Sequence, residues 1–357
     1  MSAIKETYNV LPRISFRWVK ANQLELDSLE VDTSVPYAYG AIKTTLDVLD
    51  LNGRDLDLPE HFKGVNENMV RLADKSGNAG LYMEVEENLS ASVVITHRLH
   101  SLNPILVEKN VIVLRKGSKL DLVMDYSSDD SVTFSDILNK IEVGEGAELN
   151  IIKVQRLNSL SRHLESRFTK VAQKRRVNYI SVEIGGKEAV VNYMTDLSGD
   201  ESEGYVKNVY LGFGERILDL SHHMNHIGKK TVSDMIFKGA LKDTSKKVFR
   251  GTLDFKRGST QSVGNEEEFT ILLSPKVKSF AIPLLLCKED DVVGNHAASA
   301  GQIDEDKLFY IMSRGFSEDE AKRMIVESYI RPIVDLIPVE EIRELVLEAV
   351  DREIKGE

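Results

Sequence analysis

The chain has 357 residues, of which 42% are hydrophobic and 29% charged, and its formal net charge is −11. These values predict a folded protein with a large core, and the negative charge argues against sequence-independent nucleic-acid binding, which depends on cationic side chains. No run of about 18 apolar residues occurs, so we expect no membrane span. The N-terminus lacks an apolar secretory segment, and the single cysteine, Cys287, suits a reducing compartment. The sequence therefore predicts a cytoplasmic location.

Residues 1–78 have a mixed, acidic composition with several breaks. Asn52-Gly53 is a turn signal, and Pro59 interrupts the chain again. Trp18 is the single tryptophan, and we expect it to pack because a large aromatic side chain stabilises most when buried. This stretch is interpreted as a small N-terminal subdomain on the surface of the protein.

From residue 79 to residue 302 the pattern changes to short, β-branched strands. Residues 247–255 alternate cleanly, with Phe249, Gly251, Leu253 and Phe255 on one face. No helical interludes mark βαβ units, which leaves a large sandwich, a barrel, a propeller or a solenoid. Glycines recur at intervals of 29, 40, 28, 25 and 19 residues, at Gly117, Gly146, Gly186, Gly214, Gly239 and Gly258. Solenoid turns have lengths in this range, which favours a β-helix without excluding a sandwich.

Helical patterns return in residues 303–357. Asp304 can cap a first helix, and Gly315 lies where a left-handed C-terminal residue belongs. Ser317 and Glu320 form a capping box at the start of a second helix, which Pro332 is predicted to end or kink. A third helix is predicted from Val339. The apolar stripes comprise Ala321, Met324, Ile325 and Tyr329 in the second helix and Ile342, Leu345, Val346, Ala349 and Val350 in the third.

The segment His222-His223-Met224-Asn225-His226 is the densest histidine cluster. On a strand, His222 and His226 share one face and His223 points the other way. Two imidazoles with a carboxylate could bind zinc or iron, but no carboxylate or thiol lies at a suitable spacing, so hydrogen-bonded interior histidines are the preferred interpretation. Cys287 lies in an apolar strand and is interpreted either as a small buried hydrophobic residue or as a lone thiolate that shares a site with a partner.

Residues 229–257 form a basic stretch within the acidic chain. Nine lysines and arginines occur against Asp234, Asp243 and Asp254, at Lys229, Lys230, Lys238, Lys242, Lys246, Lys247, Arg250, Lys256 and Arg257. Lysines on exposed strand edges deter mispairing between sheets. We therefore interpret this stretch as a solvated strand edge.

The stretch from Asp290 to Gly315 joins the strand-rich and helical regions. It contains, in order, Asp290-Asp291-Val292, His296-Ala297-Ala298, Gly301-Gln302-Ile303-Asp304, Leu308-Phe309-Tyr310 and Ser313-Arg314-Gly315. This order resembles the C-terminal signature of the SufB/SufD family, the scaffold subunits of the SUF iron–sulfur cluster assembly system. The similarity continues upstream through His226, Thr231-Val232-Ser233-Asp234, Lys238-Gly239-Ala240-Leu241 and Val248-Phe249-Arg250-Gly251. Leu11-Pro12-Arg13 with Trp18 is similar to the family's N-terminal segment.

The resemblance implies a mainly β fold, a right-handed parallel β-helix over residues 79–302 with a small N-terminal subdomain (1–78) and a C-terminal α-helical domain (303–357). It also implies a non-enzymatic scaffold that docks a SufC-type ABC ATPase through its C-terminal helices and pairs with a SufB/SufD-type subunit or with itself as a homodimer. A transient iron–sulfur cluster would form at that interface, with no tightly bound cofactor. The implied cluster or metal ligands are His296 and His226, which fall on histidines of the family pattern. Cys287 is a further candidate because it is the single thiol of the chain, although the family usually has an aliphatic residue at its position. The implied ATPase-docking residues are Phe309, Tyr310, Arg314, Met324, Ile325 and Tyr329.

The sequence also departs from the family pattern. SufD-like members often carry Cys-Ser-His-Gly-Ala where this chain has Gly294-Asn295-His296-Ala297-Ala298. One cysteine cannot supply four thiolates to a cluster, so the chain looks closer to SufD or to a compact self-pairing variant. Two alternatives stay open. One is a purely structural paralogue without cluster ligands, and the other is a carbohydrate-active β-helix enzyme, which would need two carboxylates facing a groove.

Overall fold

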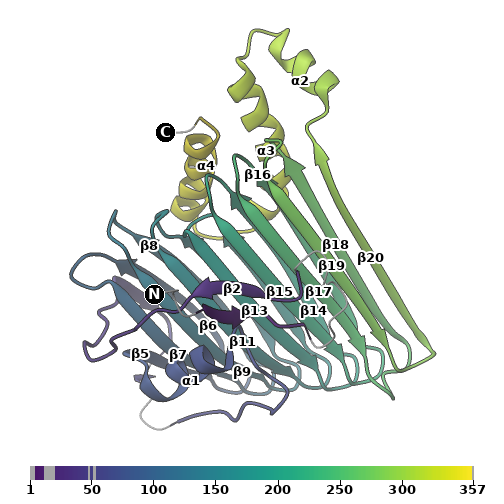
Figure 1. Cartoon of the computed structure of the whole chain (residues 1–357). Coiled ribbons are helices and arrows are strands. Elements are labelled where there is room, and N and C mark those ends of the chain that lie inside the picture. Colours follow the sequence, from purple (N-terminus) through teal and green to yellow (C-terminus); the bar gives the residue numbers. More distant parts are fainter. Residues whose placement is uncertain (1–4, 12–20, 47–48, 51–53, 356–357) are drawn as a thin grey trace.

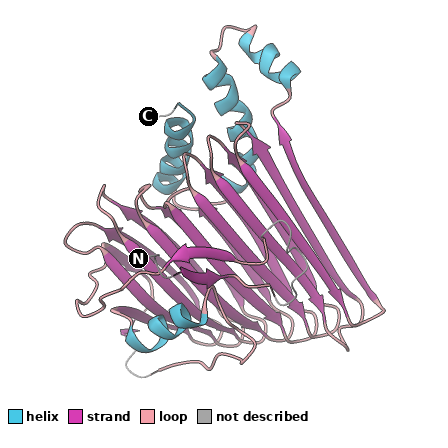
Figure 2. Cartoon of the chain, viewed as in Figure 1, coloured by secondary structure: helices cyan, strands magenta, loops and turns pink. Residues whose placement is uncertain are grey.

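The computed structural model describes residues 5–11, 21–46, 49–50 and 54–355. Pro12, Arg13 and Trp18, which carry the N-terminal resemblance, lie outside the described residues, as does the Asn52-Gly53 turn signal. The chain is mainly β, with 51% of residues in strands, and forms a β-solenoid of about 8 turns. Two nine-stranded sheets face one another along its length (Figures 1 and 2). The predicted β-helix is therefore confirmed.

Each turn of the solenoid contributes one strand to each sheet. The β6–β20 sheet contains, in spatial order, β20 (Val292–Gln302), β18 (Ser262–Leu272), β16 (Val232–Leu241), β14 (Glu203–Gly212), β12 (Arg176–Glu183), β10 (Glu148–Arg156), β8 (Lys119–Ser128), β6 (Ser90–Leu99) and β3 (Ala41–Thr44). The β5–β19 sheet contains β19 (Lys278–Cys287), β17 (Lys246–Phe255), β15 (Ile217–His226), β13 (Glu188–Leu197), β11 (Arg162–Val171), β9 (Phe134–Val143), β7 (Ile105–Leu114), β5 (Ala79–Val85) and β4 (Leu49–Asp50). Neighbouring strands from β5 to β20 are parallel.

The strand register sets the length of one turn. Lys119, Glu148, Arg176 and Glu203 are successive partners along the β6–β20 sheet, at steps of 29, 28 and 27 residues. Five of the six recurring glycines have positive φ angles, at Gly117, Gly146, Gly186, Gly214 and Gly258. The sixth, Gly239, lies inside β16, where a Cβ atom would come within 2.2 Å of the Tyr210 ring. Five of the recurring glycines therefore lie at corners of the solenoid turns, and the sixth, Gly239, lies where the chain packs closely against Tyr210.

Side chains that alternate along the strands fill the space between the two sheets. Phe249, Leu253 and Phe255 are buried there in one large apolar cluster, as their alternation predicts. Their outward-facing neighbours on the β5–β19 sheet lie under the N-terminal segment. That segment contains the antiparallel pair β1 (Lys5–Tyr8) and β2 (Leu24–Asp27) and the helix α1 (Glu67–Ser76), which packs against β7 and β9 (Figure 1).

Three helices follow the solenoid. α3 (Glu318–Val334) and α4 (Glu340–Lys355) pack on the outer face of the β6–β20 sheet, whereas α2 (Glu305–Met312) extends beyond it and has no buried residue (Figure 1). The predicted caps at Asp304 and Ser317 are confirmed. Among the described residues, no helix is long and apolar enough to span a membrane.

One detail of the helical prediction was wrong, and another is tested only in part. Pro332 was predicted to end or kink α3, and the helix continues two residues beyond it, to Val334, where Ile333 and Val334 are buried against the sheet and neighbouring helix. This packing outweighs the single backbone hydrogen bond that a proline removes. Leu345 was placed on the apolar face of α4, but it is exposed. Buried residues of α4 lie at Ile342, Val346, Ala349, Val350 and Ile354.

Candidate functional site

One end of the solenoid has no capping element among the described residues. β19 and β20 are the last strands of their sheets, and they pair with β17 and β18. At the opposite end, antiparallel strands cover the sheets, because β3 pairs with β6 and β4 pairs with β5. Edge strands of 10 and 11 residues present backbone N–H and C=O groups along their free side. This open end is therefore suited to pairing with another strand.

His296 lies on β20, the outermost strand of the open end, and is exposed. The orientation of β20 follows from Gly294, where a Cβ atom would lie 2.6 Å from Leu285 and 3.0 Å from Phe255, both between the sheets. Because side chains alternate along a strand, His296 faces the same interior as Gly294. Its Cα partner on β18 is Glu266. The imidazole is thus placed at the mouth of the solenoid.

Cys287 is the last residue of β19 and is also exposed. Its Cα partner is Phe255 on β17, whose own partner is His226 on β15. These three residues form one column along the β5–β19 sheet. The fold therefore aligns Cys287 with His226 but inserts Phe255 between them, and it places His296 on the facing sheet.

His226 is fully buried. Its Nδ1 lies 2.7 Å from the Thr231 hydroxyl and its Nε2 lies 2.9 Å from the Ser233 hydroxyl. Burial lowers the pKa of His226 to about 4, so the ring is neutral near pH 7. Coordination of a metal would require one of these two hydrogen bonds to break. The role of His226 as a ligand stays a prediction, as do those of His296 and Cys287.

The strand faces predicted for the histidine cluster are confirmed. His222 faces the interior, between the rings of Tyr193 and Phe237, whereas His223 faces the outer side of the β5–β19 sheet. Within the described part of the chain, no three His, Cys, Asp or Glu side chains gather closely enough to hold a metal ion. The preferred interpretation, hydrogen-bonded interior histidines, is confirmed for His226. His222 is also buried, but neither of its ring nitrogens has a hydrogen-bond partner among the residues described.

Two buried glutamates lie just inside the open end, and neither was predicted from the sequence. Glu268 of β18 accepts hydrogen bonds from Tyr210 and Thr270, and its carboxylate lies 2.8 Å from Lys247 Nζ. Glu266 is only 2% exposed, and its Oε2 has no hydrogen-bond partner. Burial, and then the charge of Glu268, raise the pKa of Glu266 to about 8. The alternation of residues 264–270 places both glutamates on one face, but three successive glutamates suggest an exposed strand.

Further buried charges lie deeper in the solenoid. Lys153 Nζ lies 2.5 Å from Glu183 and 3.1 Å from Glu165, and Arg167 contacts Glu165 at 2.7 Å. Burial opposes ionisation of Glu165, but the charges of Arg167 and Lys153 hold its pKa well below the usual range. A charged network therefore lies in the centre of the core, where removal of one member would leave an uncompensated charge.

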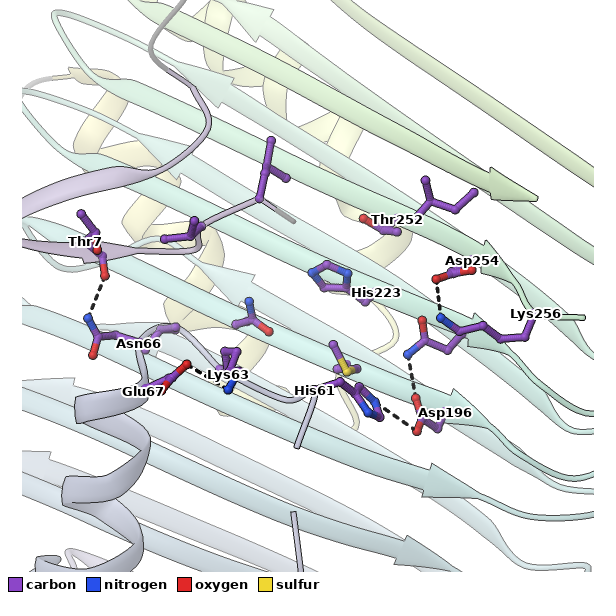
Figure 3. Close-up of a pocket in the computed structure, with 18 of the residues that line it drawn as sticks. Thr7, His61, Lys63, Asn66, Glu67, Asp196, His223, Thr252, Asp254 and Lys256 are labelled. Atoms are coloured by element: carbon purple, nitrogen blue, oxygen red, sulfur yellow. Dashed lines mark hydrogen bonds and ion pairs between the residues drawn. The ribbon is translucent and has the colours of Figure 1, made fainter. Parts of the chain in front are cut away.

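A cavity of about 930 Å³ lies on the outer side of the β5–β19 sheet, beneath the N-terminal segment (Figure 3). Asp196 accepts a hydrogen bond from Asn225 at 2.7 Å, and its other oxygen lies 3.7 Å from His61. Asp254 contacts Lys256, while its Oδ1 has no partner. None of the predicted site residues lines this cavity. Polar and charged side chains line it among apolar ones, and Leu286 of β19 extends the lining to the outer face of the last turn.

The predicted docking residues lie on α2, on α3 and in the segment between them. Tyr310, Met324, Ile325 and Tyr329 line one groove of about 610 Å³ between the two helices. The guanidinium of Arg314 lies 5.0 Å from the Tyr310 ring centroid and donates a hydrogen bond to its hydroxyl. Phe309 does not line the groove and is 73% exposed. The fold thus brings together five of the six predicted residues, whereas the Phe309 side chain is exposed outside the groove.

Comparisons with known proteins agree with the sequence resemblance. Residues 97–329 match the family model described as SUF system FeS cluster assembly, SufBD core domain. The chain is 25% identical over 283 residues to the iron-sulfur cluster assembly protein SufD of Bacillus subtilis, an alignment that covers 78% of this chain and 65% of that protein. It is 25% identical over 335 residues to an iron-sulfur cluster assembly SufBD family protein of Mycobacterium leprae, covering 92% of this chain and 37% of that protein.

A SufBD family protein of Staphylococcus saprophyticus is 26% identical over 267 residues, covering 74% of this chain and 57% of the relative. The chain thus spans between 37% and 65% of the lengths of these three relatives. The family model covers well over half of the 357 residues and includes most of the solenoid, together with α2 and part of α3. The chain therefore belongs to the SufBD core-domain family of the SUF system of iron–sulfur cluster assembly.

Proposed function

We propose that this chain is a non-enzymatic scaffold subunit on which an iron–sulfur cluster is assembled at an interface with a second SufB/SufD-type chain or with another copy of itself. The observation that carries this proposal is the open last turn, where β19 and β20 present free edges together with Cys287 and His296. A cluster bound there would be transient cargo. Its remaining ligands would come from the partner, because this chain contains one cysteine.

The same proposal assigns α2 and α3 to the docking of a SufC-type ABC ATPase. Phe309 and Tyr310 are 73% and 59% exposed on a helix that buries none of its residues. Large aromatic side chains in such positions are typical of binding surfaces. Nucleotide hydrolysis by the docked ATPase would then move the helices and, through them, the open end.

The docking claim is tested by co-purification with the SufC-type ATPase of the same organism. We expect the double variant Phe309→Ala/Tyr310→Ala to lose the ATPase. The matched control is Leu102→Ala/Val132→Ala, which removes two side chains that are 87% and 70% exposed in corners of the solenoid. Retention of the ATPase by the α2 variant would contradict the docking claim.

The pairing claim is tested with proline substitutions in β20. Consecutive N–H groups of an edge strand point alternately toward the neighbouring strand and toward the open side. Of the variants Ala297→Pro and Ala298→Pro, one therefore removes a donor to β18 and the other removes a donor on the free edge. We expect the variant that loses the donor on the free edge to stay folded but to elute as an unpaired chain in size-exclusion chromatography with light scattering. Normal pairing by both variants would argue against an edge-to-edge interface.

The cluster claim is tested by His296→Ala in the reconstituted complex. We expect a lower cluster yield, measured by the visible absorbance of the assembled cluster, with unchanged pairing and ATPase binding. His100→Ala, at a corner between β6 and β7, is the control. A normal yield from the His296 variant would favour the alternative of a purely structural paralogue that contributes docking and pairing without a ligand.

A further inference from the structure

Glu266 occupies a space that the facing sheet leaves open for it. A Cβ atom added to Gly251 of β17 would lie 2.2 Å from the Glu266 carboxyl group. Because any larger residue would displace this carboxyl, Gly251 makes room for it between the sheets. The next residue in the Gly251 column is Pro283 of β19, which belongs to the last turn. Glu266 therefore lies in the interior, one turn below the open end.

The environment of Glu266 does not satisfy its carboxyl group. Its Oε2 is buried without a hydrogen-bond partner, and no ion pair is formed by either oxygen within the described residues. The nearby cation, Lys247, contacts Glu268 instead. Buried polar atoms in folded proteins are almost always paired. Glu108, Glu183 and Glu268 also have one orphaned oxygen, but their second oxygen contacts a histidine or a lysine. Glu266 has no such contact with any described residue, which leaves its carboxyl group open to a ligand or a bound ion.

His296 is the neighbour of Glu266 in the last turn. The two residues are Cα partners on adjacent parallel strands, which lie about 4.8 Å apart. Both side chains face the interior, as the contacts of Gly251 and Gly294 show. The residues on either side of His296 on this face are Gly294 and Ala298, which are small. An exposed imidazole at the rim thus lies directly above a buried carboxyl group.

We propose that Glu266 and His296 together form a two-donor half-site for a divalent transition-metal ion such as Fe²⁺ at the mouth of the solenoid. Imidazole and carboxylate are a donor pair that ferrous iron accepts. The half-site leaves coordination positions for water or for ligands of a paired subunit. The inference rests on the proposed scaffold function, because iron is the cargo of that assembly. It assigns to Glu266 the role of second metal ligand.

Cobalt(II) chloride serves as the probe, since Co²⁺ resembles Fe²⁺ in ligand preference and its visible absorption reports the ligands. The full-length chain is titrated with Co²⁺, and the variants Glu266→Gln and His296→Ala are compared with Glu267→Gln. Glu267 is the matched control because it is exposed on the opposite face of the same strand. We expect each of the first two variants to bind Co²⁺ at least about tenfold more weakly than the wild-type chain. The control should bind like the wild type.

A second measurement separates this inference from the proposed function. Pairing and cluster yield are recorded for Glu266→Gln in the reconstituted complex. Weak Co²⁺ binding by both site variants, together with a low cluster yield from Glu266→Gln, would support the half-site. Normal Co²⁺ binding by Glu266→Gln, or an equal loss in Glu267→Gln, would overturn it. Cluster assembly that depends on His296 alone would overturn the role of Glu266 while leaving the scaffold function intact.

Discussion

His226 stacks on Phe255 inside the solenoid, with ring centroids 4.5 Å apart and 18° between the ring planes. Both of its nitrogens are hydrogen-bonded in the same buried position. We predict that His226→Ala lowers the free energy of unfolding by about 2–4 kcal/mol, because it removes a packed ring and leaves a cavity. Urea denaturation measures this loss. His61→Ala, at a side chain that is 56% exposed, is the control. Equal stabilities of the two variants would contradict a structural role for His226.

The buried histidines make the fold sensitive to acid. Burial lowers the pKa values of His163 and His226 to about 4 each, whereas histidines titrate near 6.5 in unfolded chains. Between these values the unfolded chain binds protons that the folded chain excludes, so the free energy of unfolding falls as the pH drops from about 6.5 to 4. Each histidine contributes at most about 3 kcal/mol to this fall. We predict that His226→Gln flattens the decline measured by urea denaturation at pH 7, 5.5 and 4.5. A slope identical to that of the wild type would show that His226 does not contribute.

Glu266 has the opposite effect on the pH dependence of stability, because it destabilises the fold as the pH rises. Its pKa is raised to about 8 from an ordinary value of 4.5. Between these values the folded chain holds a proton that the unfolded chain has released, so stability falls as the pH rises through this window. We predict that Glu266→Gln is more stable than the wild type at pH 8 by a few kcal/mol, since one pKa unit corresponds to about 1.4 kcal/mol. The difference should shrink at pH 5. Parallel stability curves for the two proteins would show that folding does not raise the pKa of Glu266.

The solenoid and its strand faces could be predicted because their signals are local or repeated. The alternation of Phe249, Gly251, Leu253 and Phe255 sets one strand face without any partner. The capping box of Ser317 is likewise contained within four residues. Such elements can be placed correctly from the sequence without knowing which distant parts of the chain they contact.

The buried charges could not be predicted in this way. Lys247 and Arg250 belong to a basic stretch that was interpreted as a solvated edge, yet both are buried. Their partners, Glu268 and Asp219, lie 21 and 31 residues away on other strands. Glu266 and His296 are strand partners 30 residues apart in the sequence. Because turns in this solenoid vary in length, this separation could not be predicted. The sequence alone therefore did not reveal which carboxylate lies below His296.

Arg250 provides a test of how the N-terminal segment is held on the solenoid. Its guanidinium contacts Asp219 and donates hydrogen bonds to the Ala21 carbonyl at 3.1 and 3.3 Å, and Asn9 donates to Asp219 at 2.7 Å. Arg250→Met would leave the buried carboxyl group of Asp219 without its cation and remove the contact to Ala21, a loss of about 3–5 kcal/mol. We predict that the segment before β3 becomes accessible to trypsin while the solenoid stays folded.

The matched control is Arg257→Met, which removes a cation from the same basic stretch at the β17–β18 corner. Limited proteolysis followed by mass spectrometry locates the cleavage sites, and circular dichroism reports whether the strands persist. Early cleavage in the Arg250 variant alone would show that this one buried cation holds the N-terminal segment over the outer cavity, because the Arg257 variant loses the same charge. Equal cleavage rates in the two variants would show that the apolar contacts of Phe62 and Met69 are sufficient to hold the segment in place.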